Sequence, residues 1–495
     1  MTTVRRTCAV LVVCAVIRMT AGTAGAADQW IEVASAHFTI TSNAGKGPTS
    51  TLAWQLEQVR SEIAVLFPWA KVDLNRPLVV FALKDEPSLK ALAPAYWEKK
   101  NNIGAATVWV SGYERTFLAL RADVEQDAKR HVNPYASSYF AYFSLILQQS
   151  TPTRLPPWFA RGLAAVVSNT VIQDASVLFG PPAPWYLETL REGHRIALPD
   201  LVAARNGSPL LKGEMLHFFD AEAWALVHFL MFADQGARWE KLGRFSGMVA
   251  SGTNPDAAFR EALGRVEDLA TPVHAYVDRS LFAYRAVQVN AEVKRESFTV
   301  APVAPAEAAA RKALFHVAMR RPAEAHAAIE EARKAGGASG AELADALLLD
   351  AEDKDDLARA ALQRAIDAGS TDAYAHYRLA SLLWTRDADR DTLTRIEALL
   401  SKAALLNVRY AAAYDFLSSV KSQLGAGDPT GLALRAVSLE PSAAHHRLTA
   451  ARLLANVKRY DEALKQVQAA SELAETDAES REAAELTAWI QRQRG

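Results

Sequence analysis

The chain has 495 residues, half of them hydrophobic and 22% charged, with a formal net charge of −1 at pH 7. This length exceeds the roughly 50–200 residues of one domain, so two or three domains are expected. The near-neutral charge, without any basic tail or Arg-rich block, argues against a nucleic acid or an anionic membrane surface as the partner.

The N-terminus has the layout of a secretory signal peptide. Arg5 and Arg6 precede an apolar run from Cys8 to Ile17, and Ala24-Gly25-Ala26 forms a cleavage motif. The run is too short to span a bilayer of about 30 Å, and no later segment reaches about 18 apolar residues. Residues 1–26 are therefore predicted as a signal peptide of an exported protein, periplasmic or in the cell envelope, without a transmembrane segment. The alternative is a buried N-terminal helix.

The cysteine usage fits that prediction. Cys8 and Cys14 are the only cysteines, and both lie in the segment that would be removed. The mature chain would then contain no thiol, which excludes disulfides, a Cys nucleophile and a Cys-ligated metal.

Residues 28 to about 125 are expected to be mixed α/β. HFTITSN (37–43) alternates apolar and polar residues, which is typical of a half-buried strand. Residues 49–67 place apolar side chains at helical spacing, 76–83 form a β-branched run, and two more strands are expected to form a hairpin around Gly112.

Residues 133 to about 290 are expected to be helical. Asn133-Pro134 and Pro156-Pro157 each begin a helix, because Pro suits the first helical position. Residues 218–234 are apolar on nearly all sides, which predicts a central buried helix with His228 as a core histidine. A further helix is expected to end at Gly264.

An Ala/Pro-rich linker is predicted at residues 291–304, followed by a repetitive Ala-rich region. Similar segments begin near residues 305, 340, 372, 409 and 441, a spacing close to 34 residues. The best copy, AHHRLTAARLLANVKRYDEALKQVQAASELA, resembles a tetratricopeptide repeat. Residues 305–495 are thus predicted as an α-solenoid of about five repeats whose groove binds a protein or peptide. The alternative is a generic Ala-rich helical bundle.

The order of elements in residues 27–290, with LPPWFARGLA and FDAEAWALVHFL, resembles the gluzincin-like, peptidase MA-like domains of exported bacterial proteins. The resemblance implies an α+β fold class: an N-terminal mixed α/β zincin-like domain with a helical subdomain, followed by the all-α solenoid. In that family one helix carries H-E-x-x-H and the next supplies a Glu, which together bind a catalytic zinc ion.

The zinc-binding side chains are missing from this sequence. In one register the motif falls on Ser138 to Tyr142, in the other on Tyr139 to Phe143, and the position of the second-helix Glu is Arg161. No His or Glu occurs between residues 132 and 187. The guanidinium of Arg161 is cationic at any usable pH and would repel zinc. We therefore predict a pseudo-peptidase without catalytic residues, metal or cofactor.

Two interpretations of these positions remain. Tyr139, Tyr142, Phe143 and Arg161 either form a cationic pocket for a carboxylate or peptide end, or the rings fill the vacated cavity and Arg161 pairs with a nearby acid. We favour the second.

Three functions compete. The first is a non-catalytic binding scaffold in the cell envelope. The second is a metal-dependent hydrolase with a non-standard site, for which Glu214 and His217, three residues apart, are the candidates. The third is a structural part of a secretion or cell-wall assembly.

Overall fold

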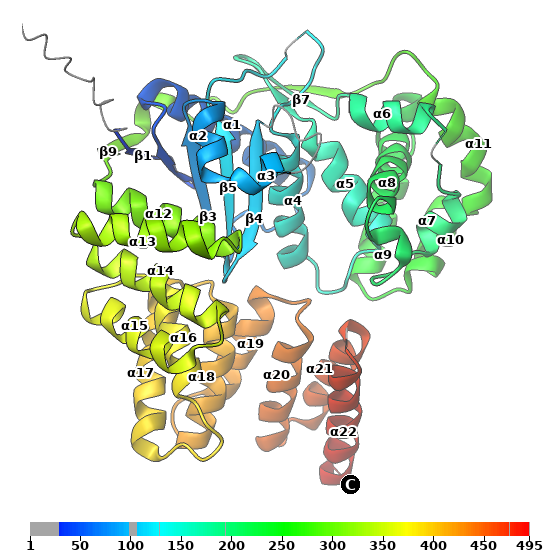
Figure 1. The fold of residues 1–495 in the computed structure, drawn as a ribbon. Coiled ribbons are helices and arrows are strands. Elements are labelled where there is room, and N and C mark those ends of the chain that lie inside the picture. Colours follow the sequence, from blue (N-terminus) through cyan, green and yellow to red (C-terminus); the bar gives the residue numbers. More distant parts are fainter. Residues whose placement is uncertain (1–28, 99–105, 128, 194, 475, 495) are drawn as a thin grey trace, which may run out of the picture.

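The structure is a computed structural model that describes residues 29–98, 106–127, 129–193, 195–474 and 476–494. The predicted signal peptide, residues 1–26, lies outside the described residues. The chain is mixed, with a sheet in its N-terminal part and helices alone from Pro305 onward (Figure 1).

A six-stranded sheet organises the N-terminal part, in the order β4-β5-β3-β2-β1-β9. Strands β2, β3 and β5 run parallel, whereas β4 pairs antiparallel with β5 and β1 pairs antiparallel with both β2 and β9. The strands are β1 (Ile31–Ala34), β2 (Thr39–Ser42), β3 (Leu78–Leu83), β4 (Thr107–Gly112), β5 (Arg115–Arg121) and β9 (Thr299–Pro302). The predicted strands β2 and β3 and the predicted hairpin β4–β5 are confirmed.

Helices cover both faces of this sheet (Figure 1). Helices α1 (Lys46–Leu66) and α4 (Ala136–Ser150) share a hydrophobic core with one face. On the other face lie α2 (Glu86–Leu92) and α12 (Pro305–Ala318). Phe315 of α12 packs edge-on against Phe81 and Phe117, with ring centroids 5.9 and 5.7 Å apart. The first helix of the repeat region therefore belongs to the core of the sheet.

The helical subdomain is built around α8 (Met215–Phe232), which packs against α5 (Pro157–Ser168). Gly162 permits this close approach, because a Cβ there would lie 2.5 Å from the Ala223 carbonyl oxygen. His228 is fully buried and its nitrogens contact the Tyr276 hydroxyl and the Gly180 carbonyl, both at 2.8 Å. The predictions of a central helix and of a core histidine are confirmed.

Four shorter helices surround α8, and one segment of this subdomain has a membrane-like composition. The helices are α6 (Pro184–Arg191), α7 (Leu198–Ala203), α9 (Trp239–Ala250) and α11 (Val266–Val277), and α10 (Pro255–Leu263) packs against α9. Among the described residues, Met215–Gly236 alone is long and apolar enough to cross a membrane, and 67% of its apolar window is buried inside the protein.

The structure departs from the sequence predictions in two places. The segment expected to be wholly helical contains a small antiparallel sheet of β6 (Val171–Ile172), β7 (Ser176–Phe179) and β8 (Arg285–Gln288). Strands of two to four residues are too short for their periodicity to be recognised. Residues 291–304, expected to be a linker, contain β9, whose Pro302 is tolerated because β9 is an edge strand.

From Pro305 onward the chain forms consecutive helix pairs that stack side by side (Figure 1). Alanines fully buried between the helices, such as Ala313, Ala361 and Ala413, let them approach closely. The remaining helices are α13 (Pro322–Lys334), α14 (Ala338–Ala351), α15 (Asp355–Asp367), α16 (Ala373–Leu383), α17 (Arg390–Leu406), α18 (Ala411–Leu424), α19 (Pro429–Leu439), α20 (Ala444–Asn456), α21 (Tyr460–Leu473) and α22 (Asp477–Arg494).

Candidate functional site

The positions on α4 at which the resemblance would place zinc ligands are filled with packed side chains. Ser138 is fully buried, and its hydroxyl is hydrogen-bonded to that of Thr107 on β4. The ring of Tyr142 lies edge-on to Phe38 at 5.8 Å, and Phe143 packs against Phe67 at 5.3 Å. These residues occupy the space between α4, the sheet and α1.

Burial also fixes the ionisation of the two tyrosines. Tyr139 and Tyr142 are each only 1% exposed, and desolvation raises the pKa of both phenols far above the ordinary value of 10. Both side chains are therefore neutral at any physiological pH. A neutral phenol is a poor substitute for the imidazole and carboxylate ligands that zinc requires.

Arg161 on α5 pairs with Asp220 of α8. Its Nη2 donates to Asp220 Oδ2 at 2.7 Å, its Nε donates to Oδ1, and the guanidinium lies 5.2 Å from the centre of the Phe140 ring. Burial raises the pKa of Asp220, although the guanidinium acts in the opposite direction. Because both carboxylate oxygens of Asp220 accept from the Arg161 guanidinium, its positive charge is already paired and is not free to bind an anionic ligand.

Glu214 and His217 do not converge on a site. His217 Nε2 lies 2.8 Å from Thr189 Oγ1 of α6, whereas Glu214 is exposed ahead of α8. The described part of the chain holds no group of three or more His, Cys, Asp or Glu side chains that could bind a metal ion.

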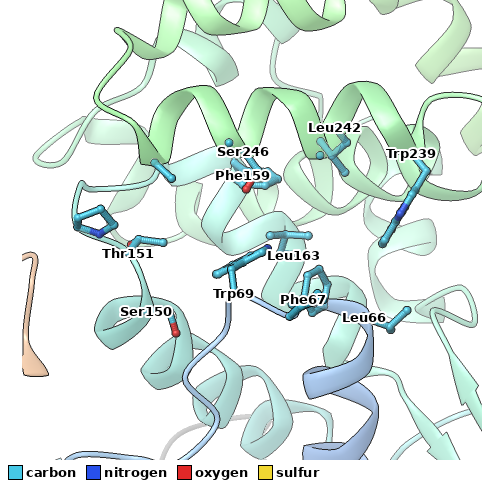
Figure 2. A pocket seen from close by; sticks show the side chains of 15 residues that line it. Leu66, Phe67, Trp69, Ser150, Thr151, Phe159, Leu163, Trp239, Leu242 and Ser246 are labelled. Carbon is cyan, nitrogen blue, oxygen red and sulfur yellow. The ribbon is translucent and has the colours of Figure 1, made fainter. Parts of the chain in front are cut away.

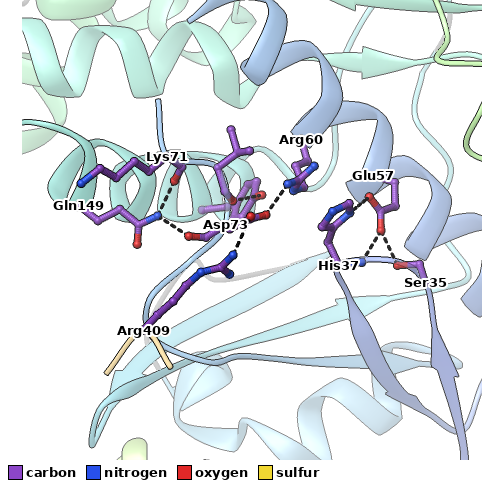
Figure 3. Close-up of polar contacts among 10 residues, drawn as sticks. Ser35, His37, Glu57, Arg60, Lys71, Asp73, Gln149 and Arg409 are labelled. Carbon is purple, nitrogen blue, oxygen red and sulfur yellow. Dashed lines mark hydrogen bonds and ion pairs between the residues drawn. The ribbon is translucent and has the colours of Figure 1, made fainter. Parts of the chain in front are cut away.

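A cluster that the sequence interpretation missed is formed by Ser35, His37 and Glu57. The buried Glu57 carboxylate accepts a hydrogen bond from Ser35 Oγ at 2.7 Å and another from the His37 backbone N at 2.8 Å, and His37 Nδ1 lies 2.8 Å away (Figure 3). Ser35 and His37 both contact the carboxylate, so the serine is not activated by the imidazole as a nucleophile requires. This cluster ties α1 to the turn between β1 and β2.

The loop of residues 71–76 joins the N-terminal part to the repeats. Asp73 accepts from Arg60 of α1 and from Arg409 Nη2, the latter at 2.9 Å (Figure 3). Asn75 is 6% exposed, its Nδ2 donates to the Leu439 carbonyl at 2.7 Å, and its carbonyl accepts from Asn407 Nδ2 at 3.0 Å.

The tip of the β4–β5 hairpin also contacts the repeats. Tyr113 stacks on Tyr374 of α16 with ring centroids 6.0 Å apart, and Arg115 Nη2 lies 2.9 Å from Asp372 Oδ2. Glu114 has a φ of 52°, which is uncommon for a residue with a side chain. Arg115 is only 7% exposed, so this part of the repeat surface is covered by the chain itself.

A line of aromatic rings continues from this hairpin across the repeats, and we name it the aromatic strip. Its members are Tyr113, Tyr374, Tyr377, Phe416 and Trp384. Successive ring centroids lie 6.0, 6.2, 6.3 and 6.4 Å apart. The strip begins beneath the hairpin and ends at Trp384, which is 43% exposed.

Comparisons with known proteins return structural similarities alone. No protein-family model matches the chain, and no curated protein matches it significantly. Solved structures that match include Pseudomonas aeruginosa pilF (15% identity, 38% of this chain, 90% of that chain, TM-score 0.30) and YrrB, titled a TPR protein with an unusual peptide-binding site (15%, 36%, 90%, TM-score 0.30). A third is TTC0263, a TPR protein of Thermus thermophilus (20%, 38%, 98%, TM-score 0.27). At these TM-scores the similarities define neither the fold nor the function of this chain.

Proposed function

We propose that this protein is a non-catalytic, exported scaffold in the cell envelope, in which a pseudo-peptidase domain supports tetratricopeptide-type repeats that bind a protein or peptide. Packed rings and a paired Arg161 at the former ligand positions support the loss of catalysis. Helix pairs that stack in one direction present an extended surface, which is how repeat proteins bind partners.

The aromatic strip is the observation that carries the binding role. Exposed aromatic side chains are enriched among the residues that dominate protein–protein affinity. The Trp384 ring contacts Phe416, with ring centroids 6.4 Å apart, yet remains 43% exposed, so it is accessible to a partner. The hairpin covers the other end of the strip, so a partner engages the repeats from the Trp384 end.

Site-specific photocrosslinking in cells tests this role. A photoreactive residue at position 384 of the full chain is expected to give one discrete adduct whose yield falls when Phe416 is replaced by Ala. The matched control is position 405 on α17, where Leu405 is 70% exposed but outside the strip. Equal adduct patterns from positions 384 and 405 would refute binding through the strip.

Metal analysis tests the absence of catalysis separately. The purified mature chain, loaded with zinc and passed through a desalting column, is expected to retain no stoichiometric zinc and to leave casein intact. One tightly held zinc ion per chain would overturn the pseudo-peptidase assignment and direct attention to Glu214 and His217.

A further inference from the structure

A deep apolar cleft lies in the helical subdomain, away from both the former zinc position and the aromatic strip. Its volume is about 350 Å³, within the range typical of small-molecule sites. It lies between the end of α1, the segment that follows α4, and the helices α5 and α9 (Figure 2). The large side chains that line it include Phe67, Trp69, Phe159, Leu163, Trp239 and Leu242.

The walls of the cleft are apolar, and none of the described residues that line them carries a charged side chain. Phe159, Leu163 and Leu242 are at most 4% exposed and form its deep part, whereas Trp69 is 38% exposed and stands at the mouth. Figure 2 shows these side chains arranged around one common space. A charged ligand would lose its hydration there without gaining a partner, so the walls select a neutral one.

Two of the hydroxyl groups that line the cleft, those of Ser150 and Thr151, are already hydrogen-bonded within the protein, and the third belongs to Ser246 of α9. Ser150 Oγ donates to the Ile146 carbonyl at 2.5 Å and accepts from the Lys71 backbone N at 2.8 Å. Thr151 Oγ1 donates to the Leu147 carbonyl at 3.3 Å. Ser150 and Thr151 are therefore not arranged to fix a polar ligand, and burial of apolar surface is the main interaction that the cleft offers.

Two glycines of α9 keep the cleft open. A Cβ added at Gly243 or Gly247 would meet no atom within 4 Å, whereas one at Gly162 would collide with α8. Each glycine inside a helix costs about 1 kcal/mol relative to alanine. Gly162 permits helix packing in return, but a Cβ at Gly243 or Gly247 would come within 4 Å of no atom of a neighbouring element among the described residues. Their effect is to leave space in the cleft.

We propose that this cleft is a binding site for a small, neutral, aromatic molecule. Four aromatic side chains surround the space, namely Phe67, Trp69, Phe159 and Trp239, and rings of this kind favour edge-on or offset contacts with another ring. The occupant is a free small molecule because 350 Å³ corresponds to one ligand and the deep walls are sunk below the surface. The site goes beyond the proposed scaffold function, with which it shares no residue.

The test uses N-phenyl-1-naphthylamine, a neutral aromatic probe that fluoresces in apolar surroundings, with the full mature chain. We expect saturable binding in the micromolar range, displacement by naphthalene methanol, and no displacement by dodecanol or by naphthalene sulfonate. Gly247→Leu is expected to weaken binding of the probe at least tenfold, because the leucine side chain fills the cleft. Because leucine favours helix over glycine, the Tm of this variant should not fall.

The matched control is Gly47→Leu on α1, where an added Cβ also meets no atom within 4 Å. This variant should bind the probe as the wild type does. Equal probe affinity of wild type and Gly247→Leu, or no saturable binding to the wild type, would overturn the proposal. Displacement by dodecanol but not by naphthalene methanol would overturn the aromatic assignment.

Discussion

At the residue scale, the sequence alone predicts that zinc ligands are absent, but it does not predict the contacts that the residues at those positions make instead. The segment from residue 132 to residue 187 contains no His or Glu, and this alone excludes the zinc-ligand set that the resemblance implies. Asp220, the partner of Arg161, lies on a helix 59 residues further along the chain. Asp220 lies beside Arg161 because α5 crosses α8 closely at Gly162. This crossing is set by tertiary packing and cannot be recognised in the local sequence.

Tyr135 and Tyr139 lie one helical turn apart at the start of α4, and together they test how the rings at these positions are packed. The Tyr139 hydroxyl is buried without a hydrogen-bond partner of normal geometry among the described residues, whereas Tyr135 Oη donates to the carbonyls of Arg121 at 2.7 Å and Val124 at 3.0 Å. Tyr139→Phe should be neutral or stabilising by up to about 1 kcal/mol, and Tyr135→Phe should cost about 1 kcal/mol. Urea unfolding of both variants checks this, and a large loss at Tyr139 would contradict the structural assignment.

A buried histidine makes stability depend on alkaline pH. His446 of α20 is 1% exposed, with Nδ1 3.3 Å from Asp415 and Nε2 3.8 Å from Glu440. Burial alone would lower its pKa, but contacts with the two carboxylates raise the pKa to about 9. Burial would raise the pKa of Glu440, but the contacts with His446 and with the guanidinium of Arg76 lower it to about 2, so that carboxylate stays charged. Because the folded pKa exceeds the ordinary 6.5, the added stability is complete below pH 6.5 and is lost as the pH rises through 9.

The loss should amount to about 3 kcal/mol between pH 6.5 and pH 10, less the contributions of other groups. Unfolding free energies at pH 6.5 and pH 10 measure it, and His446→Gln should remove most of the difference. His445→Gln is the control, since the pKa of His445 is lowered by burial and it is already neutral in this window. An unchanged pH slope in His446→Gln would show that another group is responsible.

At the element scale, long periodic segments were predictable and short pairing segments were not. The helical spacing of Leu52, Leu56, Val59 and Ile63 was enough to place α1, because all four are buried on one side. Strands β1 and β9 have four residues each, and they are defined by pairing across more than 260 residues of chain. Periodicity in a window cannot detect such a pairing.

The contact between the hairpin and α12 gives a test at this scale. A Cβ at Gly112 of β4 would lie 2.9 Å from Ala318 Cβ of α12. Gly112→Val should therefore push α12 from the sheet and lower the unfolding free energy by about 1–3 kcal/mol, although valine favours strands. Gly47→Ala, which meets no atom within 4 Å, should be neutral or stabilising. A stable Gly112→Val variant would mean that α12 does not pack this closely.

At the scale of the whole molecule, α12 makes the two parts of the chain dependent on each other. Composition indicates a boundary near residue 304, and the Ala-rich helix pairs do begin there. Yet Phe315 closes one face of the sheet against Phe81 and Phe117, and Arg311 reaches Glu32 at 2.8 Å. A change in composition does not reveal that one amphipathic helix packs against the sheet and against the repeat helices at the same time.

Two truncations measure this dependence. Residues 29–304 alone would expose the face formed by Phe81, Leu83, Leu89 and Phe117, all at most 1% exposed in the full chain. Large exposed apolar patches cause aggregation, so this fragment should bind a hydrophobic dye and unfold without a cooperative transition. Residues 29–337 keep α12 and α13 and should unfold cooperatively, as measured by circular dichroism. If the shorter fragment is as stable as the longer one, the sheet does not need α12, and the repeats would be an independent domain after all.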